Sequence, residues 1–152
     1  MIRPLFYALL SVALIGCSES GGVAGSDRDA RVLAQAVARP AALAAAMPFD
    51  VEITATNVST EPISLTMTSG CSFSYEVQAP DGRVIAAPVY PCTAVMRSLT
   101  LVAGEVLRET YRYETGEVTF PRLPSGSYRI VPSLNVRNLP GLVVRAAMLE
   151  VR

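Results

Sequence analysis

The chain alternates between apolar and polar residues over three consecutive stretches in its first half. In the stretch 49–57, Phe49, Val51, Ile53 and Ala55 occupy odd positions, while the even positions are polar. A period of two residues is typical of a strand with one buried face. The sequence therefore predicts three such strands: Phe49–Asn57, Ile63–Thr68 and Phe73–Val77. A turn at Ser59–Pro62 separates the first two, and a turn at Pro80–Gly82 follows the third.

The second half of the chain continues this pattern. Tyr128, Ile130 and Leu134 share one parity within their stretch, and Pro132 predicts that this strand lies at a sheet edge or is bulged, because proline cannot donate to a ladder. Seven or eight short strands with frequent turns predict one all-β domain, an antiparallel β-sandwich, over residues 48–152. The further predicted strands are Ala94–Val102, Glu105–Glu114, Ser127–Val136 and Val143–Val151.

The first sixteen residues have the pattern of a secretory signal. Arg3 precedes an apolar run from Leu5 to Ile15, which is shorter than the roughly 20 residues that a membrane span needs. Leu14–Cys17 resembles the lipobox of bacterial lipoproteins, which implies cleavage after residue 16 and a diacylglyceryl group on Cys17. An ordinary signal peptide with an incidental cysteine is the alternative.

The predicted lipid on Cys17 makes the membrane a partner of the mature protein, since several acyl chains hold a protein stably on a bilayer. Ser18 follows the cysteine, where lipoproteins kept in the inner membrane usually have Asp. We therefore expect a lipid-anchored protein of the bacterial cell envelope, with the outer membrane or cell surface favoured.

Residues 17–47 are expected to be a tether. Ser18–Gly25 is rich in small residues and is typical of a flexible spacer. Asp27–Ala38 contains good helix formers and is followed by Pro40, which favours a short helix. Two interpretations stay open, a partner-binding amphipathic helix and a partly helical stalk.

Three cysteines occur in the chain, and two remain once Cys17 carries lipid. In an exported protein, Cys71 and Cys92 are expected to form a disulfide with a structural role. A pair of free thiols is the alternative. A catalytic thiol is disfavoured because no histidine or lysine is present to activate it.

The composition excludes most hydrolase mechanisms. The chain has no histidine, and all thirteen of its basic residues are arginine. Ser-His, Cys-His and Ser-Lys pairs, Schiff bases and histidine-ligated zinc are thereby excluded. The remaining candidates for carboxylate chemistry are better explained as a solvated strand face, so we expect no enzyme, no catalytic residue, no metal and no cofactor: Asp81, Glu105, Glu109, Glu114 and Glu117.

A family resemblance covers roughly Phe49 to Tyr128. It rests on Asn57 and Pro62 before Ile63-Ser64-Leu65, on the strand Phe73–Val77, on Asp81-Gly82-Arg83-Val84, and on Leu101-Val102-Ala103-Gly104-Glu105. This order of turns and strands resembles the BsuPI family of proteinase inhibitors. The resemblance implies an immunoglobulin-like sandwich and an inhibitory activity, without implying which residues would inhibit.

Two functions are consistent with these features. The first is a non-catalytic protein-binding module, with a protease as one candidate partner, that presents a loop such as Val89–Thr93 or Thr115–Glu117. The second is a structural or accessory envelope lipoprotein that docks to its partner by strand-edge pairing. The formal net charge is zero, so nucleic acid is not expected as a partner.

Overall fold

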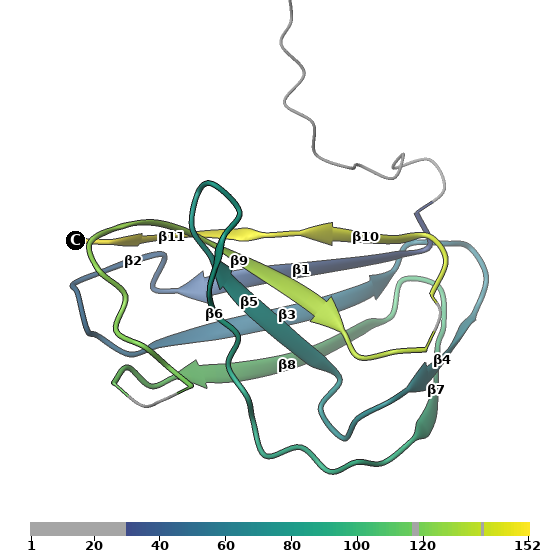
Figure 1. Ribbon diagram of the computed structural model, residues 1–152. Coiled ribbons are helices and arrows are strands. Elements are labelled where there is room, and N and C mark those ends of the chain that lie inside the picture. The colour runs from purple at the N-terminus through teal and green to yellow at the C-terminus, as the bar shows by residue number, and fades with distance from the viewer. Residues whose placement is uncertain (1–29, 117–118, 138) are drawn as a thin grey trace, which may run out of the picture.

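The computed structural model describes residues 30–116, 119–137 and 139–152, and these form an all-β sandwich (Figure 1). Two main sheets and a two-stranded ribbon make up the described part. The predicted signal peptide and Cys17 lie outside the described residues. The strands are β1 (Val32–Arg39), β2 (Ala42–Leu43), β3 (Phe49–Asn57), β4 (Ile63–Met67), β5 (Phe73–Gln78), β6 (Val84–Ala86), β7 (Arg97–Leu101), β8 (Val106–Tyr113), β9 (Gly126–Leu134), β10 (Leu142–Arg145) and β11 (Ala147–Val151).

The first sheet has the strand order β10-β1-β3-β8. Antiparallel ladders join β3 to β1 and to β8, with Ile53 opposite Ala36 on one side and Glu109 on the other. The parallel pairing of β10 with β1 completes this sheet. Strand β8 is therefore its last strand on the side away from β10.

The second sheet has the order β2-β11-β9-β5-β6, and the ribbon pairs β4 with β7. The chain passes directly from the first sheet to the second between β1 and β2 and again between β10 and β11. At both points the two successive strands pair in different sheets, which ties the two layers together at their edge.

The core lies between the two sheets and follows the predicted alternation. Phe49, Val51, Ile53 and Ala55 of β3 are fully buried, and Tyr128, Ile130 and Leu134 of β9 are buried opposite them. The fold class and the inward face of these strands are thus confirmed. The ring of Phe49 stacks on Tyr113 at a centroid distance of 4.7 Å.

The segment predicted as a tether or short helix is instead part of the sandwich. Residues Val32–Arg39 form β1, whose inward side chains are Val32, Ala34, Ala36 and Ala38, all buried. Alanine favours a helix in isolation, but its small side chain also fits a closely packed strand between β3 and β10. The sandwich therefore begins at Val32 and not at residue 48.

The position of Pro132 is also corrected. Strand β9 lies in the interior of its sheet, between β11 and β5, and is not an edge strand. Pro132 pairs with Tyr75 of β5, whereas the ladder with β11 ends at Ile130. Proline is tolerated there because β11 does not pair with β9 at residue 132. On that side of β9, the missing N–H of Pro132 therefore removes no ladder hydrogen bond.

Candidate binding loop and its anchors

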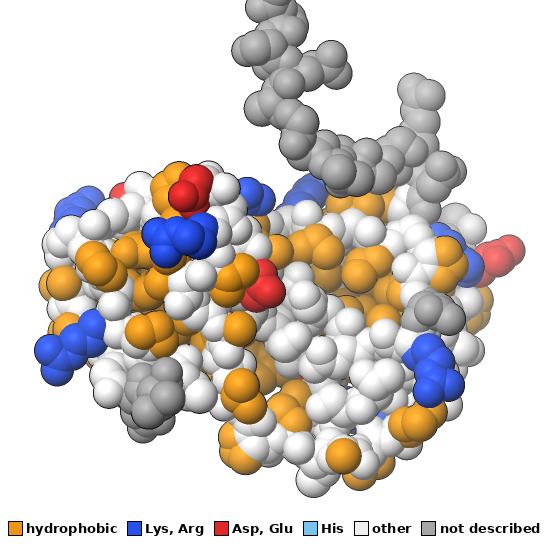
Figure 2. Space-filling model, viewed as in Figure 1, with side chains coloured by type: hydrophobic (Ala, Val, Ile, Leu, Met, Phe, Trp, Pro, Cys, Tyr) orange, Lys and Arg blue, Asp and Glu red, His pale blue; other side chains and the backbone are white. Residues whose placement is uncertain are grey.

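The long connection between β6 and β7 is apolar and largely exposed. Residues 87–96 contain no charged side chain and no strand. Val89 is 71% exposed, Val95 is 50% exposed and Met96 is 59% exposed. We call residues 87–96 the apolar loop. In Figure 2, apolar and uncharged side chains cover the lower part of the face, where Figure 1 shows this loop passing below β8.

The disulfide is the first anchor of the apolar loop. Cys71 and Cys92 are bonded, with a Cα–Cα distance of 5.4 Å, within the usual range for a disulfide. The amide of Gly70 donates to the carbonyl of Thr93 at 2.8 Å, next to the bridge. The loop is therefore fixed to the segment that precedes β5.

The side chain of Tyr90 is the second anchor. Its ring lies 4.8 Å from that of Tyr111 and 5.6 Å from that of Phe120. Its hydroxyl hydrogen-bonds the hydroxyl of Tyr75 at 2.8 Å and donates to the carbonyl of Arg112 at 3.0 Å. Burial raises the pKa of both Tyr75 and Tyr90. The loop therefore exposes the side chain of Val89 to solvent, while the neighbouring side chain of Tyr90 is held against Tyr111 and Phe120.

A polar cluster lies beneath the loop. The carboxylate of Glu109 on β8 points inward and accepts hydrogen bonds from the amide and hydroxyl of Ser72 and from the hydroxyl of Tyr111. The Arg97 guanidinium donates to the Ser72 hydroxyl at 2.7 Å. Burial and the neighbouring Glu109 raise the pKa of Tyr111. No buried side-chain nitrogen or oxygen of the described residues lacks a hydrogen-bond partner. The cluster holds the start of β5 against β8.

Sequence reasoning placed Glu109 on a solvated face and did not identify Ser72. The parity of Glu109 matches that of Tyr111 and Tyr113, which are buried, and this was the available signal. What the sequence could not supply is the partner, because Ser72 lies 37 positions away in the chain.

The other candidate carboxylates do not join this cluster. Glu105 accepts from the amide of Val102, Glu114 pairs with Arg112, and Asp81 accepts from the amide of Arg83. Glu117, and with it the end of the second candidate loop Thr115–Glu117, lies outside the described residues. Thr115 donates from its hydroxyl to the carbonyl of Ala46 at 2.7 Å. The contacts of Glu105, Glu114 and Asp81 are thus made with other groups than those that surround Glu109.

The described residues contain neither a cluster of metal ligands nor a membrane-spanning helix. Within these residues, no group of three or more cysteine, aspartate or glutamate side chains is placed to hold a metal ion. The same part of the chain contains no helix that is long and apolar enough to cross a membrane.

Comparisons with known proteins show likeness in structure alone. No family model matches the chain, and no curated protein matches it. Among solved structures, Pseudomonas fluorescens alkylpurine DNA glycosylase AlkC, bound to DNA containing an abasic site analog, is 17% identical with a TM-score of 0.48, over 81% of this chain and 31% of that one. The CARDB domain of the PF1109 protein from Pyrococcus furiosus, in complex with di-metal ions, is 14% identical with a TM-score of 0.45, over 80% and 87%.

A third similar structure is the sporulation control protein Spo0M from Bacillus subtilis. It is 10% identical with a TM-score of 0.45, over 80% of this chain and 49% of that one. The chain therefore spans less than a third of the glycosylase and about half of Spo0M. The class of protein remains that defined by the two sheets themselves, an all-β sandwich of immunoglobulin-like type.

Proposed function

We propose that this protein is a non-catalytic binding module, anchored by lipid in the bacterial cell envelope, that presents the apolar loop to a protein partner. The observation that carries the proposal is the combination of exposure and anchoring in this loop. Val89 is 71% exposed, while Tyr90 and Cys92 on either side of Pro91 hold the backbone in place. A fixed loop loses little conformational entropy on binding, so its apolar surface contributes more of its free energy to affinity.

A protease is one candidate partner, on the resemblance to the BsuPI family. The loop is compatible with that role because it is held at defined points and exposes a small apolar side chain. The absence of histidine and lysine is in turn compatible with a role that needs no catalytic group of its own. The resemblance assigns no inhibitory residue, so Val89 enters this proposal only on its exposure.

The experiment is crosslinking of the lipidated protein in envelope membranes, followed by identification of the bound partner and by protease assays. Val89→Asp should abolish capture by placing a charge in the contact. The matched control is Val84→Asp on β6, a valine that is 46% exposed and lies outside the loop. Equal capture by both variants would overturn the assignment of the loop. A captured protease that loses activity would support inhibition.

Docking by strand-edge pairing is the second candidate, and β8 is the longest of the four edge strands of the two main sheets. Its outward side chains are already engaged, since Arg108 pairs with Glu52 at 3.4 Å and Arg112 pairs with Asp50 at 3.0 Å. The hydroxyl of Tyr90 also donates a hydrogen bond to the backbone carbonyl of Arg112. Charged side chains and a covered carbonyl are features by which proteins protect edges from pairing. These observations favour the loop over the edge.

The lipid anchor is a separate part of the proposal and has its own test. Cys17 lies outside the described residues, and the prediction rests on the lipobox resemblance and the apolar run before it. Mass spectrometry of the mature protein should show a diacylglyceryl group at Cys17, and Cys17→Ser should release the protein from membranes. An unmodified Cys17 would contradict the anchor and leave the binding loop to be judged on its own.

A further inference from the structure

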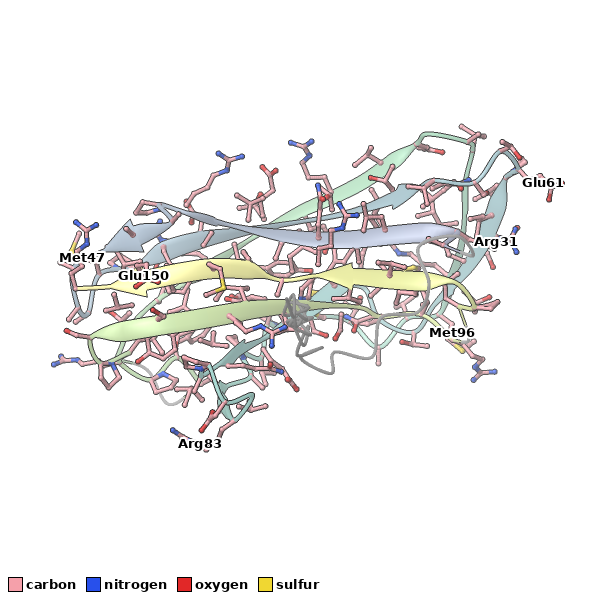
Figure 3. All side chains as sticks on the ribbon, turned by 90° about the horizontal axis from the view of Figure 1, so that it is seen from above. Arg31, Met47, Glu61, Arg83, Met96 and Glu150 are labelled. Atoms are coloured by element: carbon pink, nitrogen blue, oxygen red, sulfur yellow. A yellow bond between two sulfur atoms is a disulfide. The ribbon has the colours of Figure 1, made fainter. Side chains whose placement is uncertain are left out.

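One end of the sandwich combines the first described residues with exposed valines. The amide of Val58 donates to the carbonyl of Arg31 at 2.9 Å, and the amide of Gly104 donates to the carbonyl of Asn57 at 2.9 Å. The turns after β3 and after β7 therefore meet beside the start of β1. In Figure 3, Arg31 and Glu61 mark this end, and Met47 lies at the opposite end.

Three valines are among the exposed side chains at this end. Val58 is 47% exposed, Val102 is 55% exposed and Val106 is 45% exposed. Val58 also lines a shallow cavity of about 250 Å³ with Leu33 and Val143. We call these five residues the apolar end patch. On the outer face of the first sheet the patch gives way to polar and charged residues farther along β3 and β8, such as Asp50 and Arg112.

We propose that the apolar end patch rests on the lipid bilayer to which the protein is anchored. The inference rests on the proposed lipid at Cys17. Twelve residues, 18–29, separate Cys17 from Ala30, and thirteen peptide steps reach at most about 45 Å. Ala30 lines the same cavity as Leu33 and Val58, so the chain from the anchor arrives at the patch itself.

The charges around the patch indicate an apolar contact. Arg31 and Arg145 are flanked by two acidic residues of the adjoining turns, Glu61 and Glu105, so neither sign dominates. Attraction to anionic headgroups is therefore not required, and small apolar side chains can enter the boundary between headgroups and acyl chains. We expect the contact to change little between about 0.1 and about 0.5 M salt, where surface charges are strongly screened.

This orientation leaves the part of the apolar loop around Val89 and Tyr90 free, while the last residue of the loop, Met96, lies toward the same end as Arg31 and Glu61 (Figure 3). Tyr90 contacts Arg112 near the far end of β8, whereas Val106 begins the same strand at the patch. The bilayer and a protein partner that binds at Val89 would therefore meet different parts of the molecule.

The experiment uses the full lipidated chain reconstituted into phosphatidylcholine vesicles, with an environment-sensitive fluorophore on an introduced cysteine. Labelling can be selective because Cys71 and Cys92 are bonded to each other and Cys17 would carry lipid. The probe is placed at Val102→Cys. The matched control is Met47→Cys, at the opposite end and 54% exposed. We expect shorter-wavelength emission and quenching by spin-labelled lipids at position 102 only, with the same result in vesicles that contain phosphatidylglycerol.

The outcomes separate this inference from the proposed anchor. Vesicle flotation reports whether the protein is held by lipid, independently of the probe. Protein that floats while both probes stay unquenched would overturn the bilayer contact and leave the anchor intact. Protein that fails to float would overturn both. Shielding of position 102 without any lipid present would show that a second copy covers the patch, which also overturns the proposal.

Discussion

The side-chain amide of Asn57 donates a hydrogen bond to the carbonyl of Leu101 at 2.9 Å, across 44 positions of the sequence. The same amide donates to the carbonyl of Glu61 at 2.8 Å, and its oxygen accepts from the amide and hydroxyl of Ser59. Asn57 is fully buried. One side chain therefore closes the turn after β3 and fastens that turn to the end of β7.

We expect Asn57→Ala to lower the free energy of unfolding by about 2 to 4 kcal/mol. The reason is that the carbonyls of Leu101 and Glu61 and the amide of Ser59 lose the hydrogen bonds that the buried Asn57 side chain makes with them. Urea denaturation followed by circular dichroism measures this. Ser59→Ala is the control: it removes only the hydroxyl at the partly exposed rim and should cost about 1 kcal/mol. An Asn57→Ala protein as stable as the parent would show that water replaces these bonds.

Two of the turns predicted from the sequence meet at this position. The segments around Asn57 and around Leu101–Glu105 are far apart in the chain but adjacent in space. The backbone amide of Asn57 donates a hydrogen bond to the backbone carbonyl of Glu105 at 3.0 Å. The sequence predicted both turns, because glycine, proline and short polar residues have local conformational preferences. It did not predict that the turns bind each other.

Strand prediction succeeded where alternation was unambiguous and failed where one residue type suits two structures. The bounds predicted for β3 are those observed, because large apolar and polar residues alternate there. The alanines at positions 34, 36 and 38 also alternate, but alanine is the best helix former and contributes little apolar area, so propensity outweighed the pattern. Pairing with β3 and β10 decided the outcome, and pairing is not visible in local sequence.

The disulfide should contribute substantially to stability. Replacing both Cys71 and Cys92 with alanine opens a loop that spans 21 positions, and the chain-entropy model gives a loss of about 3 kcal/mol. The urea midpoint of the double variant is compared with that of the oxidised parent. A reduced parent protein should match the double variant. If the double variant unfolds at the parent's midpoint, the bridge has no net effect on folding.

The carboxylate of Glu109 should stabilise the fold by accepting hydrogen bonds from Ser72 and Tyr111. In Glu109→Gln the size is kept, but one oxygen becomes an amide nitrogen that faces the donors of Ser72 and Tyr111. We expect a loss of about 1 to 3 kcal/mol in the free energy of unfolding, because a buried donor is left unpaired.

The matched control for this change is Glu114→Gln on the exposed end of the same strand region, where the carboxylate pairs only with Arg112. Surface ion pairs contribute about 0 to 1 kcal/mol, so this variant should stay close to the parent. Equal losses in the two variants would contradict the distinction between the polar cluster and the surface.

Alkaline pH should destabilise the fold through its buried tyrosines. Burial raises the pKa of Tyr113 to about 12, and it also raises the pKa of Tyr75 and Tyr111. An unfolded tyrosine titrates near about 10. The folded state therefore holds protons that the unfolded state releases, so stability is fully present below about pH 10 and is lost as the pH rises toward about 12. Each such tyrosine contributes a slope of up to about 1.4 kcal/mol per pH unit.

Urea denaturation at about pH 8, 10 and 11 measures this slope, and the absence of lysine removes the other side chain that normally titrates in that range. Tyr113→Phe is the informative variant. It loses the hydrogen bond to the carbonyl of Pro121, so it should be less stable by about 1 kcal/mol at pH 8. It also loses one titrating group, so its stability should fall less steeply above about pH 10. Parent stability that stays constant up to about pH 11 would mean that these hydroxyls ionise without unfolding the sandwich.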